Sequence, residues 1–286
     1  MAKIAIVTDS NSGISQKEGN AMGIFVIPMP FMVDGAEFFE DISLTQEQFY
    51  EKLAGGADVL TSQPSLENVA KMWDKVLGEY DEIVHIPMSS GLSSATQSAL
   101  VLAEDYGGRV AVVDNLRISV VLRQSILDAI RLAGEGSTAA EIKQKLEDDR
   151  YNCSIYIMLD TLDYLKKGGR ITPAAAMIGS VLKIKPVLQI QGDKLDAFAR
   201  VRSLNQGKIT MINAIRRDML KRFGGADSTH VKLHIAHTQN LAEAHIFRDE
   251  VLEIYPDMAP IQVDCLSLSV ACHIGPGALA IACTKN

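Results

Sequence analysis

Short apolar runs that alternate with helical patterns fill the first half of the chain, and they constrain its fold more than any other feature. Helical patterns occur at 46–53, 66–77, 94–105 and 120–133. Strands alternating with helices predict βαβ units and a parallel sheet. Three apolar runs each lead into a loop segment with polar residues: KIAIV, EIVHIP and RVAVV. Asp9 and Ser10 follow the first run, Ser90 and Gly91 follow the second, and Asp114 follows the third. Because parallel strands end at one edge of a sheet, where ligands bind, these residues should line one crevice.

The pattern changes after about residue 150. A hairpin is predicted to turn at 191–194, and a helix is predicted at 172–182, beginning with Thr172 and Pro173. The further predicted strands are 153–159, 231–237, 261–266 and 279–283, and the further predicted helices are 208–223 and 241–254. We therefore expect an α/β chain of two domains. Residues 1–150 should form a three-layer domain with a mainly parallel sheet, and residues 151–286 a smaller α+β domain with a mixed sheet.

Charge and hydropathy exclude several classes of function. The formal net charge is −7 and no basic tract is present, which argues against nucleic-acid binding. No apolar run approaches the ~20 residues of a membrane span. The four consecutive apolar residues before Thr8 are too few for the core of a signal peptide, so we expect a cytoplasmic protein.

No cofactor or metal motif is found. The four cysteines have neither CxxC nor zinc-site spacing, and we expect reduced, mostly buried thiols: Cys153, Cys265, Cys272 and Cys283. In the strand 231–237, His234 and His237 point to opposite faces, which argues against a shared metal ion. The sequence therefore predicts no metal and no cofactor.

The stretch HIPMSSGLSSATQSA, residues 85–99, is rich in hydroxyls and contains no charged residue of the Lys, Arg, Asp or Glu type. It lacks the glycine pattern of an esterase elbow, the lysine of a phosphate loop and the spaced glycines of a dinucleotide site. What remains is a strand, a hydroxyl-rich loop and a helix start that Ser93 or Ser94 can cap. Such a place favours one small anion, a carboxylate or a single phosphate. The alternative is that these serines only cap the helix and form the turn before it.

Further polar residues extend this candidate site. The segment VLTSQPS supplies Thr61 and Ser62 before a proline-stiffened turn. Near the end, we expect His273 to lie in a glycine-rich loop, HIGPG, where it could donate to an anion and change charge near neutral pH, although a structural role is the alternative. Asp9 and Asp114 could form a carboxylate pair, but we favour a structural role in which Asp9 binds turn N–H groups.

Basic residues are grouped in the second half, in LKKGGRI, KIKP and ARVR. Basic groups of this kind are usually solvated charges on the protein surface. A surface role is less expected for Arg170, because an arginine that follows two glycines could be held toward the crevice.

Taken in order, TDS, TSQPS, SSGLSSATQSA, LDYLKKGGRI, LKIKPVL and HIGPG resemble the DegV family along nearly the whole chain. The resemblance implies a fatty acid enclosed between two α/β domains. It also implies the role of an acyl-carrier subunit of bacterial fatty acid kinase, which presents the carboxylate to a separate ATP-using kinase subunit. Thr61, Ser62 and Ser93 would hold the carboxylate with His273 close by. Arg170 and Arg202 would serve the anionic end or face the kinase.

The chain departs from the family pattern at Ser94-Ala95-Thr96, where Gly-Thr-Tyr is usual, and at Asn115. On this interpretation the protein binds lipid and has no complete catalytic apparatus of its own. Two alternatives remain open. One is a hydrolase or transferase that uses Ser93 or Ser90 with His273, and the other is a lipid sensor without phosphorylation.

Overall fold

The computed structural model describes residues 2–170, 172, 184–192 and 194–286. The chain divides into two compact units. The first comprises Met1–Arg150 together with Ser267–Ser269, and the second comprises Tyr151–Leu266 together with Val270–Asn286. Each unit has its own main sheet and its own hydrophobic core.

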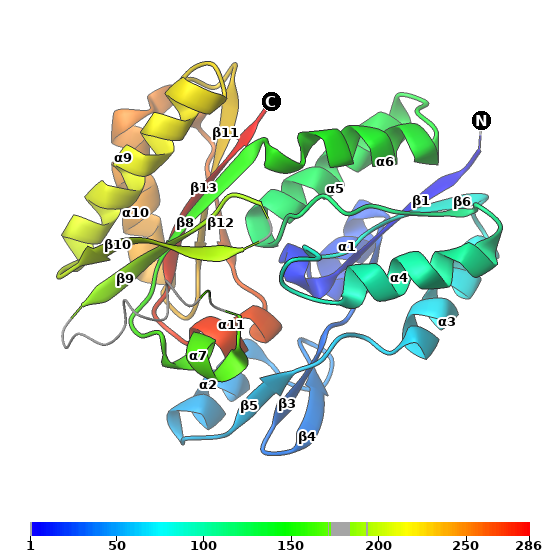
Figure 1. The fold of residues 1–286 in the computed structure, drawn as a ribbon, viewed down its shortest axis with the longest axis horizontal. Helices are drawn as coiled ribbons and strands as arrows, with labels where there is room; N and C mark the ends of the chain where they lie inside the picture. The colour runs from blue at the N-terminus through cyan, green and yellow to red at the C-terminus, as the bar shows by residue number, and fades with distance from the viewer. Residues whose placement is uncertain (1, 171, 173–183, 193) are drawn as a thin grey trace. The chain divides into compact units, whose positions relative to one another are not determined.

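The main sheet of the first unit has four parallel strands in the order β2-β1-β6-β7. Its two central strands, β1 and β6, are labelled in Figure 1. Their bounds are Ile4–Asp9 for β1, Phe25–Ile27 for β2, Glu82–Ile86 for β6 and Val110–Val112 for β7. The predicted parallel sheet is confirmed. Since all four strands run the same way, their carboxyl ends share one edge.

Helices cover both faces of this sheet. Trp73 of α3 (Leu66–Leu77) and Ala99 of α4 (Ala95–Ala103) pack in one core with Ala5 and Val7 of β1. Helices α5 (Ser119–Gly134) and α6 (Ala139–Asp148) also pack on the sheet and are absent from that core, so they cover the opposite face. Two further helices are α1 (Gln16–Met22) and α2 (Gln46–Ala54), the latter begun by a capping box of Thr45 and Gln48.

A second, antiparallel sheet in this unit was not anticipated from the sequence. Its order is β4-β3-β5, with bounds Ala36–Phe39, Pro30–Val33 and Val59–Thr61. The turn between β3 and β4 is Asp34-Gly35, and both residues have positive φ, 50° and 81°. Asp-Gly is the strongest short hairpin signal, and it was present in the sequence. The strands themselves are too short for a clear alternation.

The second unit contains a six-stranded mixed sheet in the order β10-β9-β8-β13-β11-β12, in which only β11 and β12 run parallel. The bounds are Cys153–Met158 (β8), Lys185–Ile190 (β9), Leu195–Val201 (β10), Val231–His237 (β11), Gln262–Cys265 (β12) and Leu279–Lys285 (β13). Helices α9 (Leu204–Arg222) and α10 (Leu241–Ile254) pack on it through side chains such as Met211 and Phe247. Apart from Thr172, the helix predicted at 172–182 lies outside the described residues.

Two differences from the sequence prediction concern helices of the second half. Helix α9 begins at Leu204, not at 208, because Ser203 caps it by accepting from Gln206 N–H at 3.2 Å. Residues Leu268–Ile274 form helix α11, so His273 lies in the last turn of a helix and not in the loop we expected. A shorter helix, α7, spans Asp163–Gly168.

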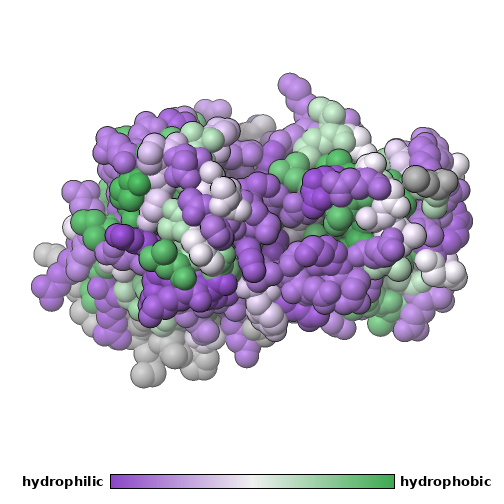
Figure 2. Space-filling model, turned by 90° about the horizontal axis from the view of Figure 1, so that it is seen from above, coloured by the Kyte–Doolittle hydropathy of each residue, from purple (hydrophilic) through white to green (hydrophobic). Residues whose placement is uncertain are grey.

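In the part of the chain that the structure describes, we find no helix with the length and apolar character needed to cross a membrane. On the face shown in Figure 2, hydrophilic side chains separate the hydrophobic ones into patches.

Candidate functional site

The side chain of Asp9 joins the carboxyl ends of two neighbouring strands of the first unit. One carboxylate oxygen accepts from Met88 N–H at 2.8 Å, just beyond β6, and the other accepts from Asn11 N–H at 2.9 Å. Asp9 is only 2 % exposed. Burial raises the pKa of this carboxyl group to about 6, although the two backbone hydrogen bonds lower it. The geometry is that of the structural role expected for Asp9.

The serine stretch is fastened to the loop that follows β7. Ser89 N–H donates to the carbonyl of Arg117 at 2.8 Å, and Val113 N–H donates to the carbonyl of His85 at 2.8 Å. The polar segments after β1, β6 and β7 are therefore hydrogen-bonded to one another at one edge of the sheet.

Ser93 and Ser94 do not cap α4 in the expected way. Ser94 occupies the cap position but makes no side-chain capping bond, and its backbone is already helical. Ser93 Oγ accepts from Ala95 N–H at 3.2 Å, which belongs to the first helical residue rather than the second or third. No described residue accepts the hydroxyl proton of Ser93. That proton is therefore available to an anion placed at the start of α4.

Thr61 and Ser62 lie at the end of the small antiparallel sheet. Thr61 is the last residue of β5 and pairs with Phe31, and Ser62 is exposed. The next residue, Gln63, exchanges two hydrogen bonds with Ser98 of α4, at 3.1 and 3.3 Å. This pair ties the segment that carries Thr61 to the helix that follows Ser93.

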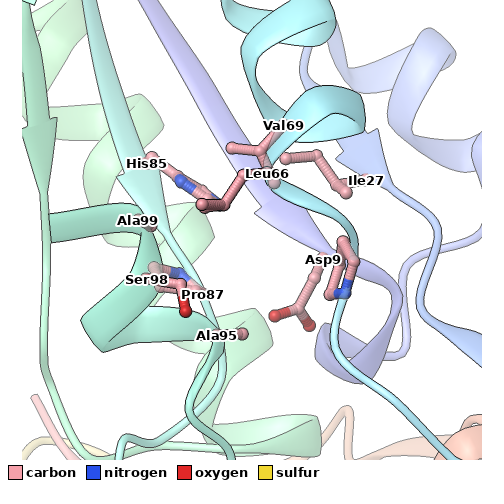
Figure 3. A pocket seen from close by; sticks show the side chains of 10 residues that line it. Asp9, Ile27, Leu66, Val69, His85, Pro87, Ala95, Ser98 and Ala99 are labelled. Atoms are coloured by element: carbon pink, nitrogen blue, oxygen red, sulfur yellow. The ribbon is translucent and has the colours of Figure 1, made fainter. Parts of the chain in front are cut away.

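A pocket opens beside these two segments (Figure 3). Its cavity volume is only about 10 Å³, and its lining is mostly apolar. The lining consists of Asp9, Ile27, Pro64, Leu66, Val69, His85, Pro87, Ala95, Ser98 and Ala99. Figure 3 shows the carboxyl group of Asp9 at the lower end of the pocket and the His85 ring at the upper end. The pocket thus combines a hydrocarbon wall with three polar groups at the carboxyl edge of the parallel sheet.

His85 is a polar feature of the pocket that the sequence analysis did not assign. It is 3 % exposed, and neither ring nitrogen has a hydrogen-bond partner among the described residues. Burial lowers the pKa of its imidazole to about 3, so the ring is neutral at pH 7. It contacts Trp73 edge to face, with ring centroids 5.5 Å apart. The available signal was a histidine inside an apolar strand, in register with Val7.

The other residues expected to line the crevice have local roles. Ser10 Oγ accepts from Met29 N–H at 3.0 Å, and Gly91 N–H donates to Ser89 Oγ at 3.2 Å. Ser90, which lies between Ser89 and Gly91 in the chain, is partly exposed. Asp114 N–H donates to Glu147 of α6 at 3.0 Å, which ties this residue to the opposite side of the sheet from the pocket.

In the second unit, the imidazole of His273 packs against the end of α7. A Cβ built on Gly168 would lie 2.1 Å from Nδ1 of His273, so no other residue fits there without a shift. Burial, followed by the nearby charge of Arg170, lowers the pKa of His273 to about 4. Our expectation that His273 changes charge near neutral pH is therefore wrong for this structure. A neutral imidazole can still donate one N–H to an anion.

The glycines after His273 allow close contacts in the same unit. Gly275 and Gly277 have positive φ, 71° and 82°. A Cβ at Gly275 would lie 2.4 Å from the ring of Tyr164, and one at Gly277 would lie 2.4 Å from the carboxylate of Asp160. These contacts explain the glycine-rich sequence, since a side chain would clash at either position.

The two arginines of the prediction lie in the second unit. Arg170 is exposed and donates to the carbonyl of Gly168 at 2.7 Å, which keeps it near His273. Arg202 is also exposed, and its N–H donates to the side chain of Gln206 at 2.9 Å. Thr61, Ser62 and Ser93 belong to the first unit.

Among the residues described, no group of three or more His, Cys, Asp or Glu side chains could hold a metal ion. The four cysteines are free thiols, and all but Cys265 are buried.

Comparison with known proteins identifies close matches along the full length. Residues 3–286 match the model of a family described as an uncharacterised protein family, DegV. A DegV domain-containing protein of Deinococcus radiodurans is 31 % identical over 281 residues, which cover 98 % of this chain and 97 % of the relative.

Solved structures match equally completely. A DegV family protein of Thermus thermophilus, described by its fatty acid binding, superposes with a TM-score of 0.90 at 28 % identity and covers 99 % of this chain and 100 % of its own. DegV of Bacillus subtilis, described as a fatty acid binding protein, gives a TM-score of 0.87 at 25 % identity and 100 % coverage of both chains.

Proposed function

The chain belongs to the DegV family, and from that premise we propose that it binds a long-chain fatty acid and presents the carboxylate to a separate kinase. The observation that carries the proposal is full-length similarity to two solved proteins that are described as fatty-acid-binding. Their identity to this chain is low enough that the residues of its own site must be argued from its own geometry.

The hydroxyl residues of the first unit suit a carboxylate. Ser93 offers a hydroxyl proton at the start of α4, and Thr61 lies in the segment that Gln63 ties to that helix. Ser62 is exposed beside it. Hydroxyl donors neutralise a carboxylate without forming a tight ion pair, so its oxygen stays nucleophilic. In the second unit His273, held neutral, supplies one further N–H donor.

Hydrocarbon burial supplies most of the affinity. At about 0.8 kcal/mol per CH₂ group, a sixteen-carbon chain contributes on the order of 10 kcal/mol before the costs of binding. The head group then need only avoid leaving a buried carboxylate without partners.

The chemistry assigned to the complex is phosphoryl transfer. A carboxylate oxygen of the bound fatty acid attacks the γ-phosphorus of ATP on the kinase, the bond to the β-phosphate oxygen breaks, and acyl phosphate and ADP form. This chain holds and orients the nucleophile, and the partner kinase holds the nucleotide. Arg170 and Arg202, both exposed, are the basic side chains we assign to the anionic end or to the kinase-facing surface.

The experiment combines lipid binding with acyl transfer. The delipidated protein should bind palmitate or oleate, and in the presence of a bacterial fatty acid kinase and ATP it should support acyl phosphate formation. A serine-reactive fluorophosphonate should not label it, whereas labelling of Ser93 or Ser90 would favour the hydrolase alternative. Lipid binding without acyl phosphate formation with any kinase tested would favour a sensor.

A further inference from the structure

The loop between β7 and α5 follows a backbone path that its own residues do not favour. Leu116 and Ser119 have positive φ, 54° and 58°. In this region the main chain crowds the side chain of any residue with a Cβ, so the conformation persists only where neighbouring contacts hold it. The loop is also buried, with Asn115 1 % and Arg117 3 % exposed. Its conformation is therefore fixed by interactions inside the first unit.

The hydroxyl group of Ser125 in α5 is the centre of these interactions. Ser125 Oγ accepts from the side-chain amide of Asn115 at 2.9 Å and from Nη1 of Arg117 at 3.0 Å. The side-chain oxygen of Asn115 accepts from Arg117 N–H at 3.2 Å. The three residues thus form a closed ring of hydrogen bonds around a fully buried hydroxyl. Loss of one member leaves polar atoms of the others unpaired and away from water, which is costly.

Arg117 extends this network to the end of α6. Its Nη2 donates to the carbonyl of Asp149, directly after that helix, at 2.6 Å. Both acceptors of the guanidinium are neutral, a hydroxyl oxygen and a main-chain carbonyl. The planar guanidinium directs separate donors to the two acceptors at once, a geometry that the compact ammonium of a lysine does not reproduce. Arg117 is therefore held through its side chain as well as through its main chain.

The carbonyl of Arg117 connects this network to the serine stretch. It accepts from Ser89 N–H at 2.8 Å, and Ser89 is 1 % exposed. The carbonyl of Ser89 in turn accepts from Leu92 N–H and from Ser93 N–H, each at 3.1 Å. Two successive main-chain hydrogen bonds therefore join Arg117 to Ser93, and all of these residues belong to the first unit.

We propose that Arg117 is a positioning residue for Ser93. Its guanidinium is held by Ser125 and Asp149, so its own carbonyl has a fixed place. That carbonyl anchors the turn that begins at Ser89, and the turn sets where the Ser93 hydroxyl stands. The consequence for lipid binding rests on the proposed function, in which Ser93 donates to the fatty acid carboxylate. The positioning itself does not, and it can be observed in the lipid-free protein.

The first experiment follows amide hydrogen exchange by NMR in the delipidated full-length protein. Arg117→Met and Ser125→Ala should each make Ser89 N–H exchange about tenfold faster relative to the amides of β1, because hydrogen bonds of the network are lost. Both variants should also shift the amide signal of Ser93. The amides of β1, a central strand, report the opening of the whole sheet, so the ratio isolates the local effect.

Two further variants of α5 are the controls. Arg131→Met removes an exposed arginine that pairs with Glu135 on the surface, and it should change neither signal. Ile126→Val removes a methylene group from a fully buried side chain, so it lowers stability without removing a hydrogen bond. It should not raise the exchange of Ser89 relative to β1, and it should leave the Ser93 signal in place.

The second experiment measures palmitate affinity in a double-mutant cycle. Arg117→Met should weaken binding about two- to tenfold, the range expected when one hydrogen bond to the ligand is impaired. On the Ser93→Ala background the same substitution should have no further effect, since Arg117 acts through that hydroxyl. Ile126→Val should leave the affinity unchanged. Thermal melts confirm that each variant is folded at the temperature of the measurement, and if Arg117→Met does not fold, Ser125→Ala carries both tests.

The outcomes separate the two ideas. In folded Arg117→Met and Ser125→Ala, unchanged exchange of Ser89 and an unmoved Ser93 signal overturn the positioning role, whatever the lipid data show. Equal weakening of palmitate binding with and without the Ser93 hydroxyl also overturns it. A Ser93 signal that moves in these variants, when the wild type binds no palmitate, supports the positioning role and contradicts the proposed function.

Discussion

The imidazole of His273 occupies the space that a side chain would need at Gly168. A Cβ at that glycine would lie 2.1 Å from Nδ1 and 2.8 Å from Cε1 of the ring. Real Cβ atoms do not approach another atom so closely, so either the ring or the end of α7 must move when Gly168 gains a side chain.

We expect Gly168→Ala to weaken palmitate binding about two- to tenfold, because the displaced imidazole no longer donates to the carboxylate. Isothermal titration with delipidated protein measures this. Gly134→Ala is the control: it lies in the last turn of α5, where a Cβ meets nothing within 4 Å. It should leave affinity unchanged and raise the free energy of unfolding by about 0.5–1 kcal/mol. Unchanged affinity in folded Gly168→Ala would argue against His273 as a ligand contact.

Ser93→Ala and Thr61→Ala should each lower palmitate affinity and the rate of acyl phosphate formation, by about tenfold for a lost bond to a charged group. Ser65→Ala serves as control from the same segment as Thr61. Ser65 caps α3 by accepting from Asn68 N–H at 3.2 Å, so its loss should cost about 1 kcal/mol of stability without an effect on binding. If Ser93→Ala and Thr61→Ala match the wild type in both assays, the carboxylate is bound elsewhere.

The buried imidazole of His85 makes a prediction about stability. The pKa of His85 is lowered to about 3, so the free energy of unfolding falls as pH drops below about 6.5, where the unfolded state takes up a proton and the folded state does not. His85→Leu removes two ring nitrogens that lack partners among the described residues, and should raise the free energy of unfolding at pH 7 by about 1 kcal/mol.

Urea denaturation between pH 4 and pH 7 checks both parts of this prediction. The fall in stability toward pH 4 should be smaller in His85→Leu than in the wild type. His245→Gln, an exposed histidine of α10, should follow the wild-type curve. A destabilised His85→Leu at pH 7 would show that the ring nitrogens are satisfied in solution.

Glu40 should have the opposite pH dependence. The pKa of Glu40 is raised to about 7, chiefly by burial, so its contribution to stability is present at low pH and is lost as pH rises from about 4.5 through 7. Glu40→Gln, which cannot ionise, should remove about 3 kcal/mol of this loss between pH 4 and pH 8. The charge of Asp41 also raises the pKa of Glu40, so Asp41→Asn should make this loss smaller and complete it at a lower pH. Parallel pH curves for Glu40→Gln and the wild type would contradict this assignment.

Local sequence patterns were sufficient for three of the four strands of the parallel sheet of the first unit, while β2 was not predicted. The runs that became β1, β6 and β7 are apolar, are bounded by polar residues and are separated by helices with clear periodicity, such as Leu66–Leu77. The position of Asp9 at a strand end followed directly from that pattern. Its bonds to Met88 and Asn11 needed only the shared edge of neighbouring parallel strands.

Other features depend on contacts that no local pattern encodes. Glu40 and Leu268 are 228 residues apart, and neither neighbourhood marks the other as its partner. Helix α11 was missed because its seven residues are too few to show helical periodicity and a glycine-rich turn follows them. His85 has no hydrogen-bond partner among the described residues because of the packing of Trp73 and the pocket, which the strand sequence alone does not specify.

The lipid that the protein carries is the most direct test of fatty acid binding. The full chain is purified from a bacterial host under native conditions, extracted with organic solvent and analysed by mass spectrometry, and the delipidated protein is then titrated with palmitate and oleate. We predict about one long-chain fatty acid per chain in the extract and saturable binding of the same class of lipid. An extract without fatty acid, together with no binding of either lipid, would contradict the central claim.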